Sequence, residues 1–187
     1  MTLDIAGCSD GELAALALGG RQAAYGELMR RHRDMTYRLV RGHIGDADAA
    51  VDVTQQAFVA AFAALGRYDG ARPFRLWLAR IAINKCRDWA RRRAVRRMFA
   101  FALPIGAAAD MADAAVAPDI LLSDRQELQR TLAAIAALPA ALKEPLILRT
   151  IEGLSQAETA QLLGIGEKAV ETRLYRARAA LKQRLRD

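Results

Sequence analysis

Residues 153–178 read GLSQAETAQLLGIGEKAVETRLYRAR, and this stretch decides the fold of the second half of the chain. Ser155 and Glu158 have the S-x-x-E spacing of a capping box, which predicts that a helix begins there. Gly164 falls where a left-handed C-cap is needed, because glycine has no Cβ to clash in that conformation. Glu167 then opens a second helix, where its negative charge suits the helix dipole. We therefore predict two short helices joined by a tight turn.

The spacing of three small or apolar residues indicates what this helix pair does. Ala160 is small where two helices must cross closely, Gly164 sits in the turn, and Val170 packs back against the first helix. This is the spacing of a DNA-binding helix-turn-helix, whose second helix enters the major groove. The alternative is a plain helical hairpin in an all-α core, but seven basic residues within positions 168–187 favour DNA. The second helix is expected to present five polar residues outward: Lys168, Glu171, Thr172, Arg173 and Arg176.

The composition of the whole chain points the same way. A chain of 187 residues fits one or two domains. Its net charge of +7 and isoelectric point of about 10.0 suit nucleic acid or an acidic protein surface as a partner. Hydrophobic residues make up 53%, largely alanine and leucine, which favours an all-α fold. Aromatic residues make up only 6%, too few for a general single-strand stacking surface, although they allow a local one.

We expect no metal, cofactor or membrane insertion. Cys8 and Cys86 lie far apart without a C-x-x-C motif, which indicates neither a disulfide framework nor a zinc site. His32 and His43 lack metal-ligand spacing, and we expect both to be surface or partly buried polar residues. The N-terminus has no basic region followed by an apolar run, and no window approaches about 18 uninterrupted apolar residues. These features predict a cytoplasmic protein.

Hydrophobic periodicity predicts helices along both halves of the chain. Apolar residues recur at helical spacing over residues 11–18, 21–40, 46–65, 74–97, 126–138 and 139–151. Gly42–Gly45 is expected to break the chain between two of these helices. Pro145 is expected to kink the helix that contains it, or to delay its start by a turn. The helix over 46–65 carries acidic and amide residues on its outer face, without basic ones: Asp48, Asp52, Gln55 and Gln56.

The helix predicted over residues 74–97 carries charge of one sign. Residues 72–97 contain ten basic residues and a single acid, Asp88. Because a solvated helix normally mixes the two signs, we favour nucleic-acid binding over a plain surface. Phe74 and Trp77 are expected to face inward, and for Trp77 the core is favoured over stacking on a base.

An abrupt change of composition separates two predicted domains, residues 1–97 and 125–187. Residues 98–124 contain no lysine or arginine, four aspartates and two prolines, Pro104 and Pro118. We predict a mostly irregular acidic linker, which fully extended would let the domains sit up to roughly 90 Å apart.

Several motifs in order across both domains resemble bacterial sigma factors of the extracytoplasmic-function group. Asp52–Phe58 stands where that family carries its acidic D-[LI]-x-Q-[DE]-x-F motif, and Phe74–Asp88 matches F-x-x-W-L-x-x-I-A-x-N-x-x-x-D. The second half fits the promoter-binding region at Leu138-Pro139, Leu148-Arg149, Glu152–Ser155 and Val170–Arg178. The resemblance covers about residues 10–97 and 125–186. It implies two helical sigma domains, region 2 and region 4, and three partners: core RNA polymerase, promoter DNA and an anti-sigma factor.

The resemblance also implies a division of labour. The first of three implied sets docks on the beta-prime clamp helices of core polymerase, although Phe58 is expected in the core rather than at the contact; its members are Asp48, Asp52, Gln55, Gln56 and Phe58. The second captures the non-template strand of the −10 element, with Asn84 at a base edge: Tyr68, Asp69, Arg72, Arg80, Asn84, Lys85, Arg87 and Arg91. The third reads the −35 duplex, while the opening helices of its domain face the polymerase flap: Arg149, Ser155, Lys168, Glu171, Thr172, Arg173 and Arg176.

Two residues depart from the family pattern. Gln56 replaces an acid in the clamp-binding motif, and Glu171 replaces the usual lysine of the recognition helix. Glu171 is expected either to alter promoter preference or to weaken phosphate binding. One wrong base contact typically costs about 1–3 kcal/mol, so sequence choice could change without loss of binding.

Two alternative functions stay open beside that of a sigma factor. One is a sigma-like decoy that sequesters an anti-sigma factor, and the other is a two-domain helix-turn-helix regulator with a ligand-sensing N-terminal domain. The decoy is disfavoured by the retained basic surfaces, and the regulator leaves the motif order unexplained. An enzyme is not expected, because the sequence has no catalytic histidine, paired-carboxylate signature or phosphate loop.

Overall fold

The structure is a computed structural model that describes residues 4–102 and 121–186, with side chains over 4–99 and 124–186. Within these ranges the regular elements are all helical, as expected. The N-terminal half holds α1 (Asp10–Leu18), α2 (Gln22–Ile44), α3 (Ala47–Ala63), the short 3-10 turn η1 (Leu65–Arg67) and α4 (Phe74–Ala102). The C-terminal half holds α5 (Leu121–Ala136), α6 (Ala140–Leu146), the π-turn η2 (Ile147–Ile151), α7 (Gln156–Leu163) and α8 (Glu167–Arg186).

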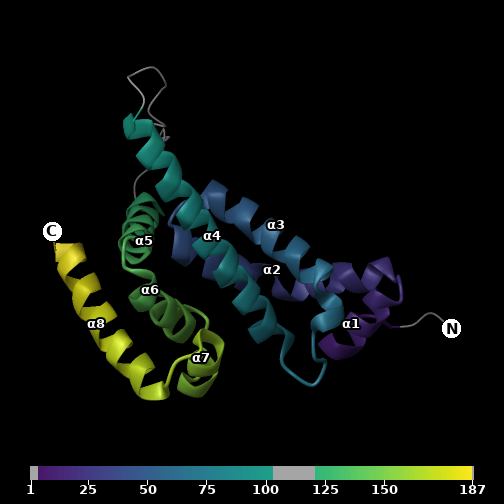
Figure 1. Cartoon of the computed structure of the whole chain (residues 1–187). Helices are drawn as coiled ribbons and strands as arrows, with labels where there is room; N and C mark the ends of the chain where they lie inside the picture. Colours follow the sequence, from purple (N-terminus) through teal and green to yellow (C-terminus); the bar gives the residue numbers. More distant parts are fainter. Residues whose placement is uncertain (1–3, 103–120, 187) are drawn as a thin grey trace.

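Helices α1 to α4 form a bundle, and α5 to α8 pack against one side of it (Figure 1). One hydrophobic core lies wholly inside the bundle, around Leu13, Leu28 and Phe74. A second core joins the two halves, with Val40 and Ala82 on one side and Ile147 on the other. The two domains that the sequence predicts therefore share buried apolar surface and do not stand apart. The distal end of α4 projects beyond this body (Figure 1).

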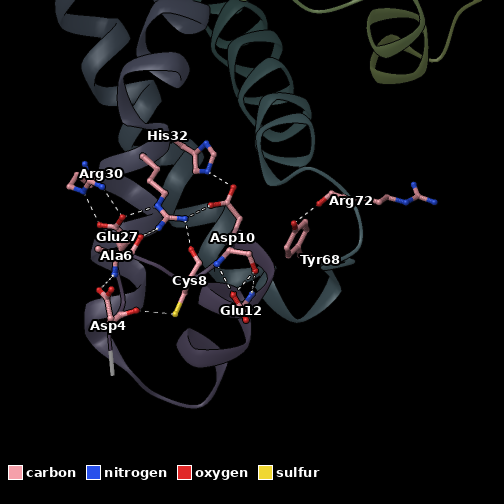
Figure 2. A network of polar contacts seen from close by, with 12 residues as sticks. Asp4, Ala6, Cys8, Asp10, Glu12, Glu27, Arg30, His32, Tyr68 and Arg72 are labelled. Atoms are coloured by element: carbon pink, nitrogen blue, oxygen red, sulfur yellow. Dashed lines mark hydrogen bonds and ion pairs between the residues drawn. The ribbon is translucent and has the colours of Figure 1, made fainter. Parts of the chain in front are cut away.

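The side chain of Arg31 on α2 ties the N-terminal segment and α1 to the bundle. Its guanidinium donates to the backbone oxygens of Cys8 and Ala6, both at 2.7 Å, and reaches the Asp10 carboxylate at 3.2 Å. His32 lies 2.8 Å from the second Asp10 oxygen (Figure 2). These hydrogen bonds hold α1 and the segment before it against α2.

The break that the sequence predicts over Gly42–Gly45 is shorter in the structure, where only the last of these residues ends the helix. The helix continues through Gly42 to Ile44, and Gly45 caps it in the left-handed conformation with φ 83°. A Cβ on Gly42 would lie 3.3 Å from Ile151 Cδ1, and one on Gly45 would lie 2.7 Å from Ala136 Cβ. Glycine is present at both positions because the C-terminal half approaches the helix backbone closely.

Pro145 does not delay the helix that contains it. Helix α6 begins at Ala140, and directly after Pro145 the backbone widens into the π-turn η2. The amide of Glu152 donates to the carbonyl of Ile147 at 3.1 Å, a bond that spans one residue more than an α-helical bond. Because proline lacks an N–H and its ring crowds the preceding turn, regular α geometry is unfavourable there.

The predicted linker over 98–124 is partly helical. Helix α4 runs on to Ala102, and α5 begins at Leu121, so both helices enter the linker from its ends. Pro104, Pro118 and three of the four aspartates lie outside the described residues. The irregular character of the segment between the helices stays a prediction.

We expect Arg31→Met to loosen α1 selectively, because it removes hydrogen bonds to two carbonyls and two carboxylates. Losses of this kind cost about 1–3 kcal/mol. Thermal unfolding and hydrogen exchange of residues 5–18 measure the effect. Arg33→Met is the matched control, because Arg33 pairs with its exposed neighbour Asp34 and has no second ion pair among residues 4–102 and 121–186. Equal protection of α1 in both variants would contradict the anchoring role.

Candidate polymerase and promoter surfaces

The outer face of α3 carries the residues predicted to bind polymerase. Asp46 caps the helix by accepting from the Ala49 amide at 2.8 Å, which fixes where α3 begins. Four predicted contact residues are exposed at positions three, four or one apart, so they share one face: Asp48, Asp52, Gln55 and Gln56.

Lys85 on α4 lies beside this acidic and amide face. It lines a shallow hollow of about 320 Å³ together with Asp52, Gln55 and Gln56. The resemblance assigns Lys85 to the −10 set. Lys85 lies five positions after Arg80, however, and this spacing places the two side chains on different sides of α4. Its surroundings are those of the polymerase set.

The side chain of Phe58 is buried in the core and is not part of the exposed face of α3. Its side chain is 3% exposed and packs against Phe62, with ring centroids 5.8 Å apart. The sequence favours this core position, and the structure gives no support to Phe58 in the contact set. Phe58 does line a groove of about 400 Å³ between α2 and α3, whose rim includes exposed Met29 and Val51. Sequence analysis missed this groove, because its rim comes from two helices whose pairing the sequence does not state.

The loop before α4 is held by Tyr68. Its hydroxyl donates to the backbone oxygen of Arg72 (Figure 2). Its ring packs against the rings of Phe74 and Trp77, with centroids 5.1 and 5.2 Å away. Trp77 is half-buried and lines a pocket of about 260 Å³ with Arg72 and Arg80. Asp69 pairs with Arg72 at 3.2 Å. The loop is thus an ordered turn whose charged residues are exposed.

Four of the residues predicted to hold the −10 strand form one stripe on α4. Arg80, Asn84, Arg87 and Arg91 are spaced four, three and four apart, the repeat of one helix face. Asn84 is exposed, and exposed Arg91 pairs with Asp88. Arg80 donates to the backbone oxygens of Gln161 and Leu162 at 2.9 and 3.3 Å.

Arg87 reaches the C-terminal half through a two-pronged contact. Its Nε and Nη2 donate to the two oxygens of Glu144 at 2.7 and 2.6 Å. His43 Nε2 lies 3.5 Å from the same carboxylate, and Lys143 Nζ donates to the His43 carbonyl at 2.9 Å. His43 is 3% exposed, which corrects the expectation of a surface or partly buried residue. Its burial follows from the packing of α5 and η2 onto α2 and from the side chains of Lys143 and Glu144, which no local pattern indicates.

The helix-turn-helix forms as predicted. Ser155 and Glu158 make the capping box, and Gly164 caps α7 in the left-handed conformation with φ 67°. Gln156 donates to the Glu167 carbonyl at 3.1 Å and so fixes the turn.

Helix α8 buries Val170 and presents most of the predicted −35 set to solvent. Lys168, Glu171, Thr172 and Arg176 are exposed, but Arg173 is half-buried at the edge of the packed face. Tyr175 is 77% exposed and shares the face of Glu171 and Thr172. Sequence analysis missed Tyr175, although its position one turn beyond those residues would have identified it.

Two other members of the −35 set have structural roles here. Arg149 lies in the π-turn, where its guanidinium turns inward and donates to the Leu154 carbonyl. Ser155 Oγ accepts from the Glu158 amide at 3.1 Å, so its hydroxyl closes the helix N-terminus. The widened turn explains why Arg149 does not point outward as the motif predicts.

The described residues form neither a recognisable metal site nor a membrane-spanning helix. Over 4–102 and 121–186, no three His, Cys, Asp or Glu side chains gather where they could hold a metal ion. No helix in the same ranges combines the length and apolarity that a membrane span requires.

Comparison with known proteins assigns the two halves. Residues 28–96 match the family described as Sigma-70 region 2, and residues 128–181 match Sigma-70, region 4. The RNA polymerase sigma factor CnrH of Cupriavidus metallidurans is 40% identical over 177 residues, with 92% of each chain covered. The ECF RNA polymerase sigma factor SigW of Bacillus subtilis is 30% identical, with 90% of this chain and 92% of that protein covered. The chain belongs to the sigma-70 family, in its extracytoplasmic-function group.

The arrangement of this sigma factor also resembles a solved relative. The structure of CnrH in complex with the cytosolic domain of CnrY covers 94% of this chain and 96% of that one, at 35% identity and a TM-score of 0.69. The function of the chain is to direct RNA polymerase to promoters. The match of residues 28–96 to region 2 replaces the alternative of a ligand-sensing N-terminal domain.

Electrostatics at the domain interface of the sigma factor centre on Glu144. Burial alone would raise the pKa of this carboxyl, but the hydrogen bonds from Arg87 and His43 outweigh it and lower the pKa to about 2. Burial lowers the pKa of His43, with help from the charges of Lys143 and Arg87 and against the pull of Glu144. Burial raises the pKa of Glu152, which Arg38 contacts at 3.2 Å.

We expect the free energy of unfolding to fall as the pH drops below 6.5, in part through His43. The pKa of His43 lies below 6.5 in the folded chain, so the unfolded chain takes up this proton first. The loss is up to about 1 kcal/mol per pH unit. Glu144 lowers the free energy of unfolding separately, and only as the pH falls from 4.5 to about 2. Glu152 has the opposite effect: because its pKa is raised in the folded chain, its protonation near that pKa increases the free energy of unfolding as the pH falls.

Urea unfolding at pH values from about 7 to about 5 gives the free energy of unfolding as a function of pH. The difference between the parent chain and a His43 variant is the contribution of His43. His43→Gln should flatten the slope relative to the parent chain. His32→Gln is the control, because His32 contacts Asp10 within the N-terminal bundle and should leave the interface contribution intact. An unchanged slope in His43→Gln would contradict the assignment.

Proposed function

We propose that this sigma factor uses three separate surfaces: the α3 face for core polymerase, the α4 stripe for single-stranded −10 DNA, and the α8 face for −35 duplex. One observation carries the proposal. The chain has a cationic helix in each sigma domain and, beside the first, a helix whose exposed face bears acids and amides without basic residues. Polyanion and polycation partners therefore have different places to bind.

The α3 face suits the basic clamp helices that the family resemblance implies. Asp48 and Asp52 supply negative charge, and the amides of Gln55 and Gln56 supply donors and acceptors. Gln56 carries no charge where the family carries an acid, which weakens long-range attraction but keeps hydrogen bonding. Lys85, at the edge of the same hollow, is well placed to pair with an acidic residue of the polymerase.

The α4 stripe suits a single strand. Arginines hold phosphates, and the exposed amide of Asn84 can donate to and accept from a base edge. Exposed Arg72 and the half-buried ring of Trp77 line a pocket with Arg80, where an unstacked base could stack. Glu158, Gln161 and Leu162 of α7 close the other side of this pocket, so a base enters only when they withdraw.

The α8 face suits the major groove. Lys168 and Arg176 can pair with guanine or phosphate, Glu171 can accept from cytosine, and the ring of Tyr175 offers apolar contact to a thymine methyl group. We therefore add Tyr175 to the −35 set. Arg149 and Ser155 support the turn instead, and half-buried Arg173 lies at its margin.

The chain acts in the cytoplasm, where its polymerase works, and it contributes binding without catalysis of its own. The solved CnrH holds the cytosolic domain of CnrY, and we propose that an anti-sigma factor regulates this chain in a comparable way. A pure decoy would not need the exposed cations of α8.

In vitro transcription tests the proposal. Core RNA polymerase from the host, given this chain and genomic DNA as template, should initiate at specific positions that sequencing of the transcripts identifies. Asp52→Lys should need about tenfold more protein for half-maximal initiation, because reversing a contact charge slows association and weakens binding. Glu127→Lys, an exposed change on α5, is the control. No initiation above core enzyme alone would overturn the proposed function.

Arg176→Ala should weaken binding to promoter duplex by about 5- to 100-fold, because a base-edge arginine contributes about 1–3 kcal/mol. Fluorescence anisotropy with a promoter found in the transcription assay gives the affinity. Arg184→Ala, at the far end of the same helix, controls for the loss of one charge. If both variants lose affinity equally, Arg176 supplies only diffuse charge.

A further inference from the structure

We propose that the distal end of α4 binds the surface of an anionic lipid membrane, with its apolar side chains in the headgroup layer and arginines around them. The surface consists of residues 92–99, RRAVRRMF, and we call it the distal α4 surface. None of the three surfaces proposed for polymerase and promoter includes it. The contact is peripheral, as for an amphipathic helix that lies in the plane of the membrane interface.

The eight residues of the distal α4 surface separate into a cationic side and an apolar side. At about 100° per residue, the four arginines fall within one arc of about 140°, and the four apolar residues fall within another of about the same width. The arginines are Arg92, Arg93, Arg96 and Arg97, and the apolar residues are Ala94, Val95, Met98 and Phe99. This division is typical of helices that lie on a membrane.

The apolar side of the distal α4 surface is exposed. Val95 is 50% exposed, Phe99 66% and Met98 74%, and their spacing of three and four residues makes them one patch. The other end of the same helix is fixed in the core by buried Phe74 and Leu78. Because the distal end projects beyond the body (Figure 1), a flat surface can reach it without displacing another helix. The helix is already formed, so binding orders little of the backbone.

The cationic side has no anionic partner within the chain. Among the residues that the structure describes, none of the four arginines forms an ion pair, and Arg93 instead lies 5.1 Å from the centre of the Trp89 ring. Residues 89–99 contain no acid. Arg92 and Arg97 border the two edges of the apolar side, so their long side chains can reach headgroups while the apolar side chains enter the membrane.

This combination of charge and exposed apolar surface favours lipid over nucleic acid or protein. A phosphate backbone would pair with the arginines but would leave Val95, Met98 and Phe99 in water. A protein would need acids in register with the arginines on both edges of an apolar groove. A layer of anionic headgroups above acyl chains supplies negative charge on every side of the apolar patch and an apolar medium beneath it.

Co-sedimentation of the full chain with vesicles tests the proposal. Vesicles of phosphatidylcholine with about one third phosphatidylglycerol are the anionic probe, and vesicles of phosphatidylcholine alone are the neutral one. We expect the parent chain to bind the anionic vesicles more than about tenfold more tightly. Added salt should release it, because salt screens the attraction between arginines and headgroups.

Arg92→Gln with Arg97→Gln should weaken binding to the anionic vesicles about 10- to 30-fold, since each arginine near the surface contributes about fivefold. Arg178→Gln with Arg184→Gln is the charge-matched control, because both residues are exposed on α8. This control should lose less than about threefold, as expected for net charge held away from the membrane.

Phe99→Ser should weaken binding about fivefold, because one large apolar side chain no longer enters the headgroup layer. Leu18→Ser is the matched control, since Leu18 is 57% exposed at the end of α1. It should bind the vesicles as the parent chain does. Circular dichroism checks that every variant keeps its helical content.

Failure of the parent chain to bind anionic vesicles would overturn the proposal. Equal losses in the two arginine pairs would also overturn it, because net charge alone would then explain the attraction. Equal losses in Phe99→Ser and Leu18→Ser would show that the apolar side does not enter the membrane.

Variants of the distal α4 surface that keep vesicle binding but lose affinity for core polymerase or promoter DNA would assign the surface to those partners instead. Initiation by the parent chain with core polymerase tests the sigma function separately, whatever the vesicles show.

Discussion

The packing of the two domains of this sigma factor depends on one carboxylate, that of Glu144, buried between an arginine fork and a histidine ring. An ionised group in such a place is costly to bury, and it is tolerated because the Arg87 guanidinium pairs with both of its oxygens and the His43 ring lies 3.5 Å from one of them. Those partners come from α2 and α4, whereas Glu144 comes from α6. The buried ion pair therefore forms only when the two domains are together. Apolar packing around Gly42 supplies the remaining fit, so charge and shape select the same arrangement.

Local signals in the sequence were enough to predict the DNA-reading half. A capping box, a left-handed glycine and a buried valine lie within sixteen consecutive positions, 155 to 170, and each acts through its immediate neighbours. The same holds for the exposed face of α3, which an acidic cap and a helical repeat define. The interface between domains could not be predicted in this way. Arg87 and Glu144 are 57 positions apart, and His43 and Glu144 are 101 apart, so only the tertiary fold brings them together.

Motif transfer was least reliable where helix geometry changes. Arg149 matches the family motif, yet the π-turn rotates it inward to close the loop before α7. Lys85 follows Asn84 directly in the motif, yet one residue of rotation moves it to the side of α3. Tyr175 was overlooked for the opposite reason, since counting along the helix face places it next to Thr172. Angular position on a helix, rather than membership of a motif, decides which of these side chains share an exposed face.

The π-turn at Ile147–Ile151 also limits how the length of this chain can vary. Each residue advances a helix by about 100°. Deleting one residue here would therefore rotate the whole helix-turn-helix, α7 and α8, by more than a quarter turn. Glu152 would lose its contact with Arg38, and the exposed face of α8 would point in another direction. Most connections between helices accept an extra or a missing residue. Between Pro145 and Gly153 the number of residues sets the rotation of α7 and α8 relative to α6. This number is therefore constrained even at positions where the identity of the side chain can change.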